Sequence, residues 1–544
     1  MASDAPGSAH TETPGRRGGR ADLTLAGLAL LVVLYLVTVL PSLGDDPIAG
    51  GDEGWIISSA ARLAHDGVFG SELFAGFYGA EDHYFFNLPL HHLILAGVFE
   101  VVGVSLGTAR MVSVVFGLAA LLLTYALGRR IGGPYVGLAA AALLVLLRLN
   151  LAPFSGLTLT DLGVTVRYDL ITVPFGLGAA LLLLRRPVPP LAHIAAAGLL
   201  VGLGALTQFI GAFVAVPLGV FLLLTPVDPK RRLVLGAIFA AFIVLPFLPY
   251  FAYIASDLDE FRGQARAVEQ STDFLSPSFY LDQLEREPDR YATSTGLEQA
   301  PEGISGLLAR PSARLVMFVV GPAAMLYALW RGRTDRSRLL LGLLVAGLVV
   351  EVALFESTKR FVYWVVVVPY LCIAVADSGV AAWRWVGERR QQLALRLAVA
   401  GLAALFLLEG LGVVAKDVRD ARDAPSYEAV DREIEAVVPA GSVVIGDNRL
   451  WPAVQDLRLR SLLLLFYHTN PVISRDRVTD IPGAFERIDA GYLLLSPLSR
   501  DILTQLSPED TAAFNSYVEQ HMTKVTTIED RAYGPIDVYQ RTGR

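Results

Sequence analysis

The stretch GGDEGWIISSAARLAHDG, residues 50–67, begins about ten residues after a long apolar run at 22–41. Two adjacent carboxylates, Asp52 and Glu53, precede an aromatic residue and a short amphipathic segment. Acidic side chains favour the first turn of a helix, so the stretch predicts a helix just outside the first membrane span. The acidic pair at this place either caps that helix or takes part in chemistry at the membrane surface.

The composition indicates a polytopic membrane protein. The chain has 544 residues with a mean hydropathy of +0.50, 53% hydrophobic residues and only 18% charged residues. Soluble domains carry about a quarter charged residues, and here long apolar runs account for the deficit. A single cysteine, Cys372, excludes a disulfide framework and a cysteine-based metal site. Nothing in the composition indicates binding of nucleic acid.

Eleven apolar segments are predicted to span the membrane. They lie at 22–41, 108–128, 134–153, 169–184, 190–207, 209–225, 233–254, 313–330, 339–356, 361–377 and 393–415. A further candidate, LPLHHLILAGVFEVVG at 88–103, is short and holds two histidines and a glutamate. The stretch 192–224 is either two short helices joined at the turn LTQFIG or one long tilted helix.

The positive-inside rule decides between these topologies. Short loops rich in arginine and lysine occur at 129–130, 185–186, 230–232, 331–338 and 384–390. All of them are cytoplasmic if the N-terminal tail is cytoplasmic, 192–224 forms two helices and 88–103 does not span. We therefore expect a multi-pass protein of the inner (cytoplasmic) membrane with its N-terminus inside. Segment 88–103 is then an interfacial helix of the first outer loop.

This topology gives a domain plan. Residues 1–21 are predicted to be a disordered cytoplasmic tail, 22–415 a transmembrane domain, and 416–544 a small extracytoplasmic α/β domain. The large outer loops are 42–107 and 255–312. In the tail, strand-like runs lie at 442–447, 492–496 and 536–541, and helix-like stretches near 450–466 and 508–522.

The topology also gathers unusual charges at the outer membrane surface. The second outer loop and the span after it, TDLGVTVRYDLITVPFG, contribute Asp161, Arg167 and Asp169. The junction FESTKRFVYW contributes Lys359 and Arg360, which break the positive-inside rule and need an acidic or phosphate partner. A carboxylate can act as general base, while cations and a divalent metal can stabilise a phosphate leaving group. The chemistry predicted is transfer of a group from a lipid phosphate to an acceptor on the outer face.

The stretch 50–133, from GGDEGW to YALGRRIGG, resembles the N-terminal signature of the GT-C glycosyltransferases. It is most similar to the bacterial family 39 branch, with protein O-mannosyltransferase-like and aminoarabinose-transferase-like enzymes. That signature has an acidic pair after the first helix, a horizontal segment before the second span, and an aromatic-Ala-Leu-Gly-Arg-Arg motif at the first inner loop. The resemblance covers about residues 22–225, and the later spans by architecture only.

The resemblance implies an inverting transfer from a polyprenyl-phosphate sugar, without a nucleotide sugar. By position, it makes Asp52 the base or a metal ligand, and gives Glu53 a catalytic, capping or donor-contact role. Asp169 matches the second-loop carboxylate, with Asp161 as its alternative. A divalent cation, Mg or Mn, would be held by Asp52 and Asp169. The acceptor is a lipid, a polysaccharide or a protein, and membrane lipids surround the enzyme.

The chain departs from the family pattern at two usual cations. Asn87 in HYFFNLPLHH and Gln208 in LTQFIG stand where lysine is usual. Together with Tyr84, they become expected contacts of the donor or acceptor. The donor phosphate is then expected to meet His91, His92, Arg167, Lys359 or Arg360.

Other interpretations remain open. The acidic pair is explained by helix capping, Asp169 by a salt bridge with Arg167, and the cation pair at 359–360 by anchoring to lipid headgroups. A transporter or flippase would place ionisable residues at mid-membrane. A polymerase or ligase of lipid-linked envelope polymers would have an arginine-rich outer loop, whereas residues 257–302 hold eleven acidic residues and four arginines.

Overall fold

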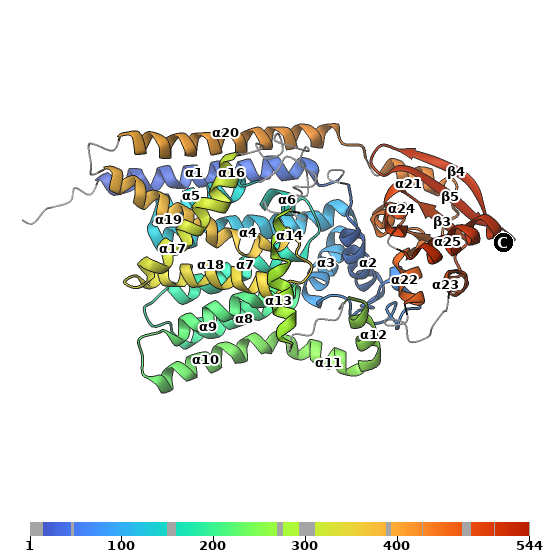
Figure 1. Ribbon diagram of the computed structural model, residues 1–544, viewed down its shortest axis with the longest axis horizontal. Helices are drawn as coiled ribbons and strands as arrows, with labels where there is room; N and C mark the ends of the chain where they lie inside the picture. Colours follow the sequence, from blue (N-terminus) through green and yellow to red (C-terminus); the bar gives the residue numbers. More distant parts are fainter. Residues whose placement is uncertain are drawn as a thin grey trace, which may run out of the picture.

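The computed structural model describes residues 15–44, 48–148, 159–268, 276–292, 311–387, 393–426, 428–470, 480–504 and 506–542. A long bundle of helices forms one end of the molecule, and a mixed α/β domain forms the other (Figure 1). The predicted fold class, a helical membrane protein with a small C-terminal α/β unit, is confirmed.

Helices coincide with each of the eleven predicted spans. They are α1 (Gly15–Val39), α4 (Leu106–Gly132), α5 (Pro134–Leu146), α7 (Tyr168–Leu184), α8 (Leu191–Thr207), η3 (Phe209–Val214) with α9 (Ala215–Leu223), α10 (Pro229–Val244) with η4 (Leu245–Phe247) and α11 (Leu248–Ser256), α16 (Pro311–Leu315) with η5 (Val316–Val320) and α17 (Gly321–Gly332), α18 (Arg336–Phe355), η6 (Phe361–Val366) with α19 (Val368–Gly387), and α20 (Leu393–Asp423). Among the described residues, six helices are long and apolar enough to cross a membrane, and several shorter apolar helices lie between them.

The stretch 192–224 forms two helices, as the arginine loops predicted. The chain leaves the helical conformation at Gln208, which has φ −155° and ψ 137° between α8 and η3. α8 also packs closely on α10, because a Cβ on Gly198 or Gly202 would lie 2.5 or 2.3 Å from a backbone carbonyl oxygen of Phe239 or Ile243. Small residues four apart permit such close approach between membrane helices.

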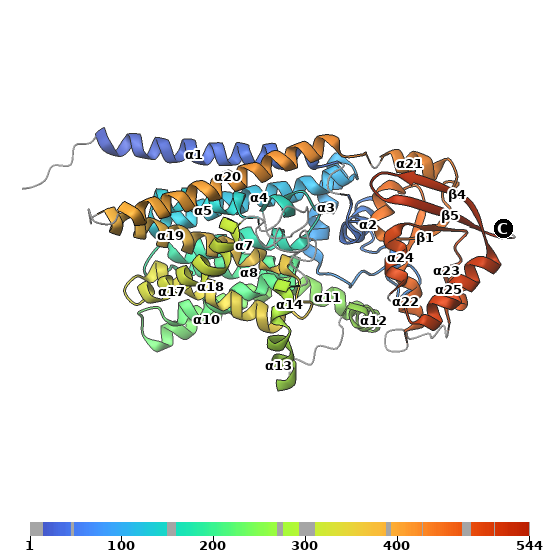
Figure 2. The same cartoon turned by 45° about the horizontal axis from the view of Figure 1, so that its top comes forward.

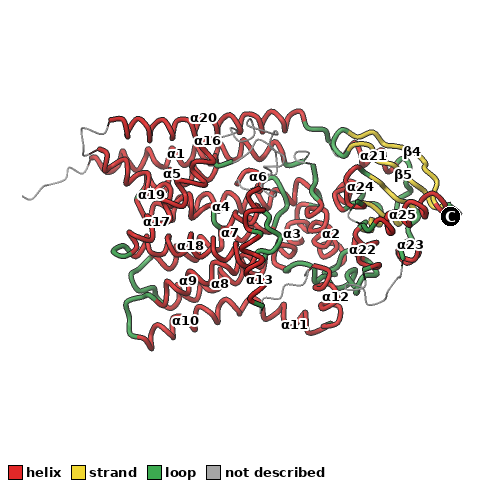
Figure 3. Tube along the Cα trace, in the orientation of Figure 1, coloured by secondary structure: helices red, strands yellow, loops and turns green. Residues whose placement is uncertain are grey.

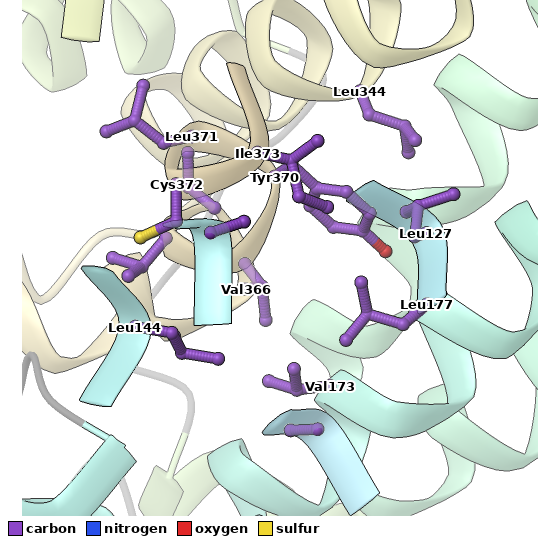
Figure 4. Packing of buried hydrophobic residues seen from close by; sticks show 14 of the residues in the cluster. Leu127, Leu144, Val173, Leu177, Leu344, Val366, Tyr370, Leu371, Cys372 and Ile373 are labelled. Atoms are coloured by element: carbon purple, nitrogen blue, oxygen red, sulfur yellow. The ribbon is translucent and has the colours of Figure 1, made fainter. Parts of the chain in front are cut away.

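The bundle core is aliphatic and aromatic. Side chains of α4, α5, α7, α18 and α19 meet there, including Leu127, Leu144, Leu177, Leu344 and Tyr370 (Figure 4). The α9–α10 and α17–α18 connections lie at the end of the bundle away from the C-terminal domain (Figures 1 and 2). The arginine-rich loops 230–232 and 331–338 therefore share one end, as the topology prediction requires.

The first outer loop holds three helical elements near the C-terminal domain. They are α2 (Gly51–Asp66), η2 (Glu72–Phe74) and α3 (Pro89–Val102). α3 has 14 residues, which makes it about 21 Å long and too short for the hydrocarbon core. The second outer loop contains α6 (Leu159–Gly163), and the third contains α12 (Leu258–Val268), α13 (Pro277–Glu285) and α14 (Glu287–Ala292).

The C-terminal domain is a five-stranded sheet with helices (Figure 3). Its elements are α21 (Glu428–Glu435), β1 (Val443–Gly446), η8 (Asn448–Ala453), β2 (Arg458–Ser461), α22 (Leu463–Thr469), α23 (Ile481–Ile488), β3 (Tyr492–Leu495), α24 (Pro497–Leu503), α25 (Pro508–His521), β4 (Met522–Asp530) and β5 (Gly534–Arg541). The strand order is β2-β1-β3-β5-β4; β1 pairs in parallel with β2 and β3, whereas β5 is antiparallel to β3 and β4.

The three predicted strands and the helix near 508–522 are present. The predicted helix at 450–466 is wrong, because this stretch forms most of η8, the strand β2 and the start of α22. In the run Arg458–Ser461, each arginine is followed by an uncharged residue. Its pairing with β1 decides its conformation. Strand β4, rich in threonine and charge, was not predicted either.

Candidate functional site

Asp52 lies in the first turn of α2, at the end of the bundle next to the C-terminal domain (Figure 1). Its side chain is 39% exposed, and its Oδ2 accepts a hydrogen bond of 2.9 Å from Nη1 of Arg167. Arg167 is the N-cap residue of α7, so the contact joins the first outer loop to the second. The structure thus holds one oxygen of an accessible carboxylate beside a fixed cation.

Arg167 binds a second carboxylate as well. Its Nε and Nη2 lie 2.8 and 2.7 Å from Oδ2 of Asp169, which is fully buried in the first turn of α7. Burial opposes the charge of this guanidinium, but Asp169 and Asp52 outweigh it and raise the pKa of Arg167 well above its ordinary value. Two carboxylates and one permanently charged guanidinium therefore form the centre of the candidate site.

Glu53 is held in a different way from its neighbour. The carboxylate is buried and pairs with Arg110 of α4, with Nε–Oε1 and Nη2–Oε2 distances of 2.9 Å each. It also accepts hydrogen bonds from the backbone N–H groups of Gly50, at 2.7 Å, and Val166, at 2.8 Å. Both oxygens are thus engaged within the protein. The geometry favours the capping role for Glu53 and does not support catalysis.

The two cations of FESTKRFVYW, Lys359 and Arg360, lie in different environments. Lys359, at φ +55°, is buried, and its Nζ donates to Oε2 of Glu287 at 3.0 Å and to the carbonyl of Ala353 at 2.6 Å. Burial lowers the pKa of Lys359, an effect that Glu287 opposes. Arg360 is exposed. The expected phosphate contact therefore finds no support at Lys359, whose ammonium is already paired.

The backbone of Arg360 is held in place, whereas its side chain is exposed. The backbone carbonyl of Arg360 accepts a hydrogen bond of 2.8 Å from Arg290, which fixes the turn while the side chain stays exposed. Of the two rule-breaking cations, Arg360 is the one that a ligand can reach.

The histidine pair of α3 is buried. Neither ring nitrogen of His91 has a hydrogen-bond partner among the described residues, whereas Nδ1 of His92 lies 2.7 Å from Oγ of Ser59. Burial lowers the pKa of His91 to about 3 and that of His92 to about 4. Neutral, buried imidazoles are poorly suited to bind a phosphate. The geometry therefore does not support the expected contact of His91 and His92 with the donor phosphate.

The structure places the residues expected to contact the donor or acceptor in different surroundings. Tyr84 is fully buried and accepts a 3.0 Å hydrogen bond from Asn87, so its hydroxyl serves the loop interior. Gln208 caps η3 by accepting from the N–H of Phe209 at 3.0 Å. Asp161 lies on α6, and its side chain is outside the described part of the structure.

The residues predicted to hold a divalent cation are joined by a guanidinium instead. Asp52 and Asp169 both bind Arg167, which supplies the positive charge between them. Among the described residues, the one group of three ligands close enough for a metal is His83, Asp257 and Glu260, which joins the first outer loop to the start of α12. The donor set at Asp52 thus gives no support to the metal prediction.

Several residues of this region were missed by sequence reasoning. Arg110 and Arg290 are completely buried, and Glu287 joins Arg290 and Lys359 in one ion-pair network. Arg110 carries a signal, because an arginine inside the apolar run LGTARMVSVVFG needs a buried acidic partner. Arg290 and Glu287 carry none, since they lie in a loop where charges are common.

Comparison with known proteins gives a family model and structural neighbours. Residues 87–251 match the model of dolichyl-phosphate-mannose-protein mannosyltransferases. A search of curated protein sequences gave no match. Among solved structures, ArnT from Cupriavidus metallidurans bound to undecaprenyl phosphate has a TM-score of 0.57 at 16% identity, over 96% of this chain and 98% of that one.

Two oligosaccharyltransferase structures from Archaeoglobus fulgidus are also similar, the first of them of AglB. The complex with an inhibitory peptide and dolichol-phosphate has a TM-score of 0.58 at 13% identity, covering 88% of this chain and 70% of that one. The form tethered to an acceptor peptide has a TM-score of 0.55 at 13% identity, covering 96% and 74%. The chain therefore shares the fold of these membrane transferases, and residues 87–251 match the family model.

Proposed function

We propose that the protein transfers a sugar from a polyprenyl-phosphate donor to an acceptor at the outer face of the inner membrane, with inversion at the anomeric carbon. One observation carries the proposal: Asp52, half-exposed, is held by Arg167 beside buried Asp169 at the outer end of the helical bundle. The structural neighbours bind undecaprenyl phosphate and dolichol-phosphate, which supports a donor of this class.

In the proposed reaction, Asp52 is the general base. An acceptor hydroxyl or amine attacks the anomeric carbon of the donor from the face opposite the phosphate. The new bond to that carbon forms as the bond between the carbon and the phosphate oxygen breaks, and the acceptor proton passes to Asp52. Arg167 orients this carboxylate through Oδ2, so that Oδ1 is the oxygen that takes the proton.

The leaving group is polyprenyl phosphate, which departs as an anion. The exposed guanidinium of Arg360 is suited to bind it, because arginine can bind phosphate oxygens at two points. Asp169 fixes the guanidinium of Arg167 through Oδ2. In this proposal the positive charge beside the leaving phosphate comes from Arg360.

The proposed orientation follows from the charges of the loops. The N-terminal tail, residues 1–21, and the arginine-rich loops are cytoplasmic, while α2, α3 and the domain at 416–544 are extracytoplasmic. The transmembrane domain, 22–415, then places Asp52 at the outer leaflet, where a lipid-linked donor meets an external lipid, polysaccharide or protein acceptor.

The test is transfer of radiolabelled sugar from synthetic polyprenyl-phosphate sugars by purified protein, in membrane extract that supplies acceptors. We expect Asp52→Asn to lose transfer by about 1,000-fold. Asp66→Asn is the matched control, because Asp66 is an exposed aspartate at the other end of the same helix. Normal transfer by Asp52→Asn would refute the assignment, and no transfer with any donor would refute the function.

A flippase is the second candidate, favoured by Glu351. This residue is buried in the spanning helix α18, and neither carboxylate oxygen has a hydrogen-bond partner among the described residues. An unpaired carboxylate at such a place is typical of transport pathways. Movement of a fluorescent lipid-linked sugar across vesicles that is lost in Glu351→Gln, without any transfer, would favour this second function.

A further inference from the structure

The first outer loop and the C-terminal domain share a hydrophobic core. Phe74, Phe77 and Phe86 of the loop lie in the same buried cluster as the inner faces of β1, β2 and β3. The Phe77 ring centroid is 5.1 Å from that of Tyr467 on α22. This arrangement fixes the domain against the loop that carries the proposed base, because a joint core cannot separate without exposing these aromatic side chains.

The closest approach involves the helix of Asp52 itself. A Cβ on Gly54 would lie 1.8 Å from the backbone carbonyl oxygen of Asn448, the first residue of η8. η8 therefore rests directly on the backbone of α2, two residues after Asp52. Only glycine permits this contact, since any larger residue would have to push η8 and α2 apart.

Trp451 of η8 extends the contact beneath the site. It packs against the domain core and also against a second cluster, formed by side chains of α2, α3, α4 and α7. Ile56 and Ile57 of α2 and Val166, beside Arg167, belong to that second cluster. One indole side chain thus joins the C-terminal domain to the helices that hold both Asp52 and Arg167.

Ionic contacts reinforce the same interface. Glu72 binds Arg62 of α2 and Arg460 of β2, and Nη1 of Arg460 also donates to the carbonyl of Glu72 at 2.6 Å. Within the domain, the hydroxyl of Tyr533, in the β4–β5 turn, donates to the carbonyl of Arg449 at 3.3 Å and so helps to hold η8 in place.

We propose that η8 of the C-terminal domain is a positioning element for Asp52, acting through the Gly54 contact and Trp451. The inference rests on the proposed transferase function. Docking of η8 sets the height and tilt of α2, and thereby the position of the Asp52 carboxylate against Arg167 and the acceptor. Trp451 and Gly54 are positioning residues, since the proposed effect of each passes through α2.

The experiment compares two glycine variants in the full-length protein. In Gly54→Ala the new methyl group collides with the carbonyl of Asn448, whereas in Gly51→Ala the methyl group meets no atom within 4 Å. We expect kcat of Gly54→Ala to fall by about 100-fold while KM for the donor stays within about twofold, because a misplacement of about 1 Å can cost this much. Gly51→Ala keeps the wild-type kcat.

A second pair of variants covers the case in which Gly54→Ala does not fold. Trp451→Ala leaves the backbone contact intact but removes the indole, and we expect a loss of kcat with unchanged KM for the donor. Trp451→Phe restores most of the rate, because an aromatic ring still fills the space. Equal loss in both, or a rise in KM without a fall in kcat, would contradict positioning.

Hydrogen exchange of residues 448–453 gives a readout besides activity. We expect faster exchange there in Gly54→Ala than in Gly51→Ala. Wild-type protein that transfers no sugar overturns the proposed function and this inference with it. Wild-type protein that transfers sugar, beside a Gly54→Ala variant with normal kcat, overturns only the role of η8.

Discussion

The carboxylate of Glu53 and the guanidinium of Arg110 form a two-point ion pair that is buried from solvent. The two N–O distances are 2.9 Å each, and both side chains are at most 2% exposed. The pair joins α2 to α4, and Glu53 also accepts the N–H of Val166, just before Arg167. Through these bonds, Glu53 fixes the backbone next to Arg167, the residue whose side chain binds Asp52.

This pair predicts a stability defect for Glu53→Gln. Replacing Glu53 removes the carboxylate charge that faces the buried guanidinium of Arg110, which costs about 3–5 kcal/mol in the free energy of unfolding. The measurement is thermal unfolding of the purified protein in detergent. The double variant Glu53→Gln/Arg110→Met is expected to recover part of that loss. A Glu53→Gln variant with wild-type stability and no transfer would instead assign Glu53 to catalysis.

Arg167→Lys is predicted to reduce transfer even though it keeps the positive charge. A single ammonium cannot reproduce the planar guanidinium that meets Asp52 and Asp169 at the same time. We expect kcat to fall by about 100-fold, because the base loses its orientation. Arg185→Lys, an exposed arginine just after the other end of α7, is the control. Full activity of Arg167→Lys would mean that charge alone suffices.

The sequence predicts this site to different degrees at different residues. The acidic pair after the first span and the aspartate of VRYD stand out in the sequence, and the structure brings Asp52 and Asp169 together on Arg167. The sequence does not predict which of the two acids, Asp52 or Glu53, is accessible to solvent. That depends on Arg110, 57 residues later, whose packing brings it to Glu53 rather than Asp52.

The fold shows the same division. Apolar runs predict where the long helices lie, since this signal is local, and a helix coincides with each of the eleven predicted segments. The strand β2 could not be predicted, because its four residues gain their conformation from pairing with β1. The contact of η8 with Gly54 could not be predicted either, since it joins residues about 400 positions apart that no local pattern connects.

Lys359 and Arg360 are predicted to respond differently to removal of their charge. Lys359→Met leaves Glu287 and Arg290 with an altered ion-pair network, so we expect lower thermal stability with an unchanged KM for the donor. Arg360→Gln is expected to raise KM for the donor by about tenfold with little effect on stability, because a charged hydrogen bond contributes about 1.5–3 kcal/mol. Reversed effects would place the phosphate at Lys359.

The buried histidines predict that the protein loses stability in mild acid. The pKa of His91 is lowered from 6.5 to about 3 and that of His92 to about 4, because burial disfavours their charged forms. The unfolded chain therefore binds more protons than the folded one between about pH 6.5 and these values. The contribution of the neutral histidines to the free energy of unfolding is fully present above about pH 6.5. It falls as the pH drops through this window.

Each histidine is expected to remove about 1.4 kcal/mol per pH unit within that window. The measurement is the unfolding free energy in detergent at pH 7.5, 6 and 5, for the wild type and for His91→Gln. His91 is the sharper choice, because neither of its ring nitrogens has a hydrogen-bond partner among the described residues. The variant should show a shallower acid slope. An identical slope in both proteins would mean that His91 becomes charged as easily in the fold as outside it.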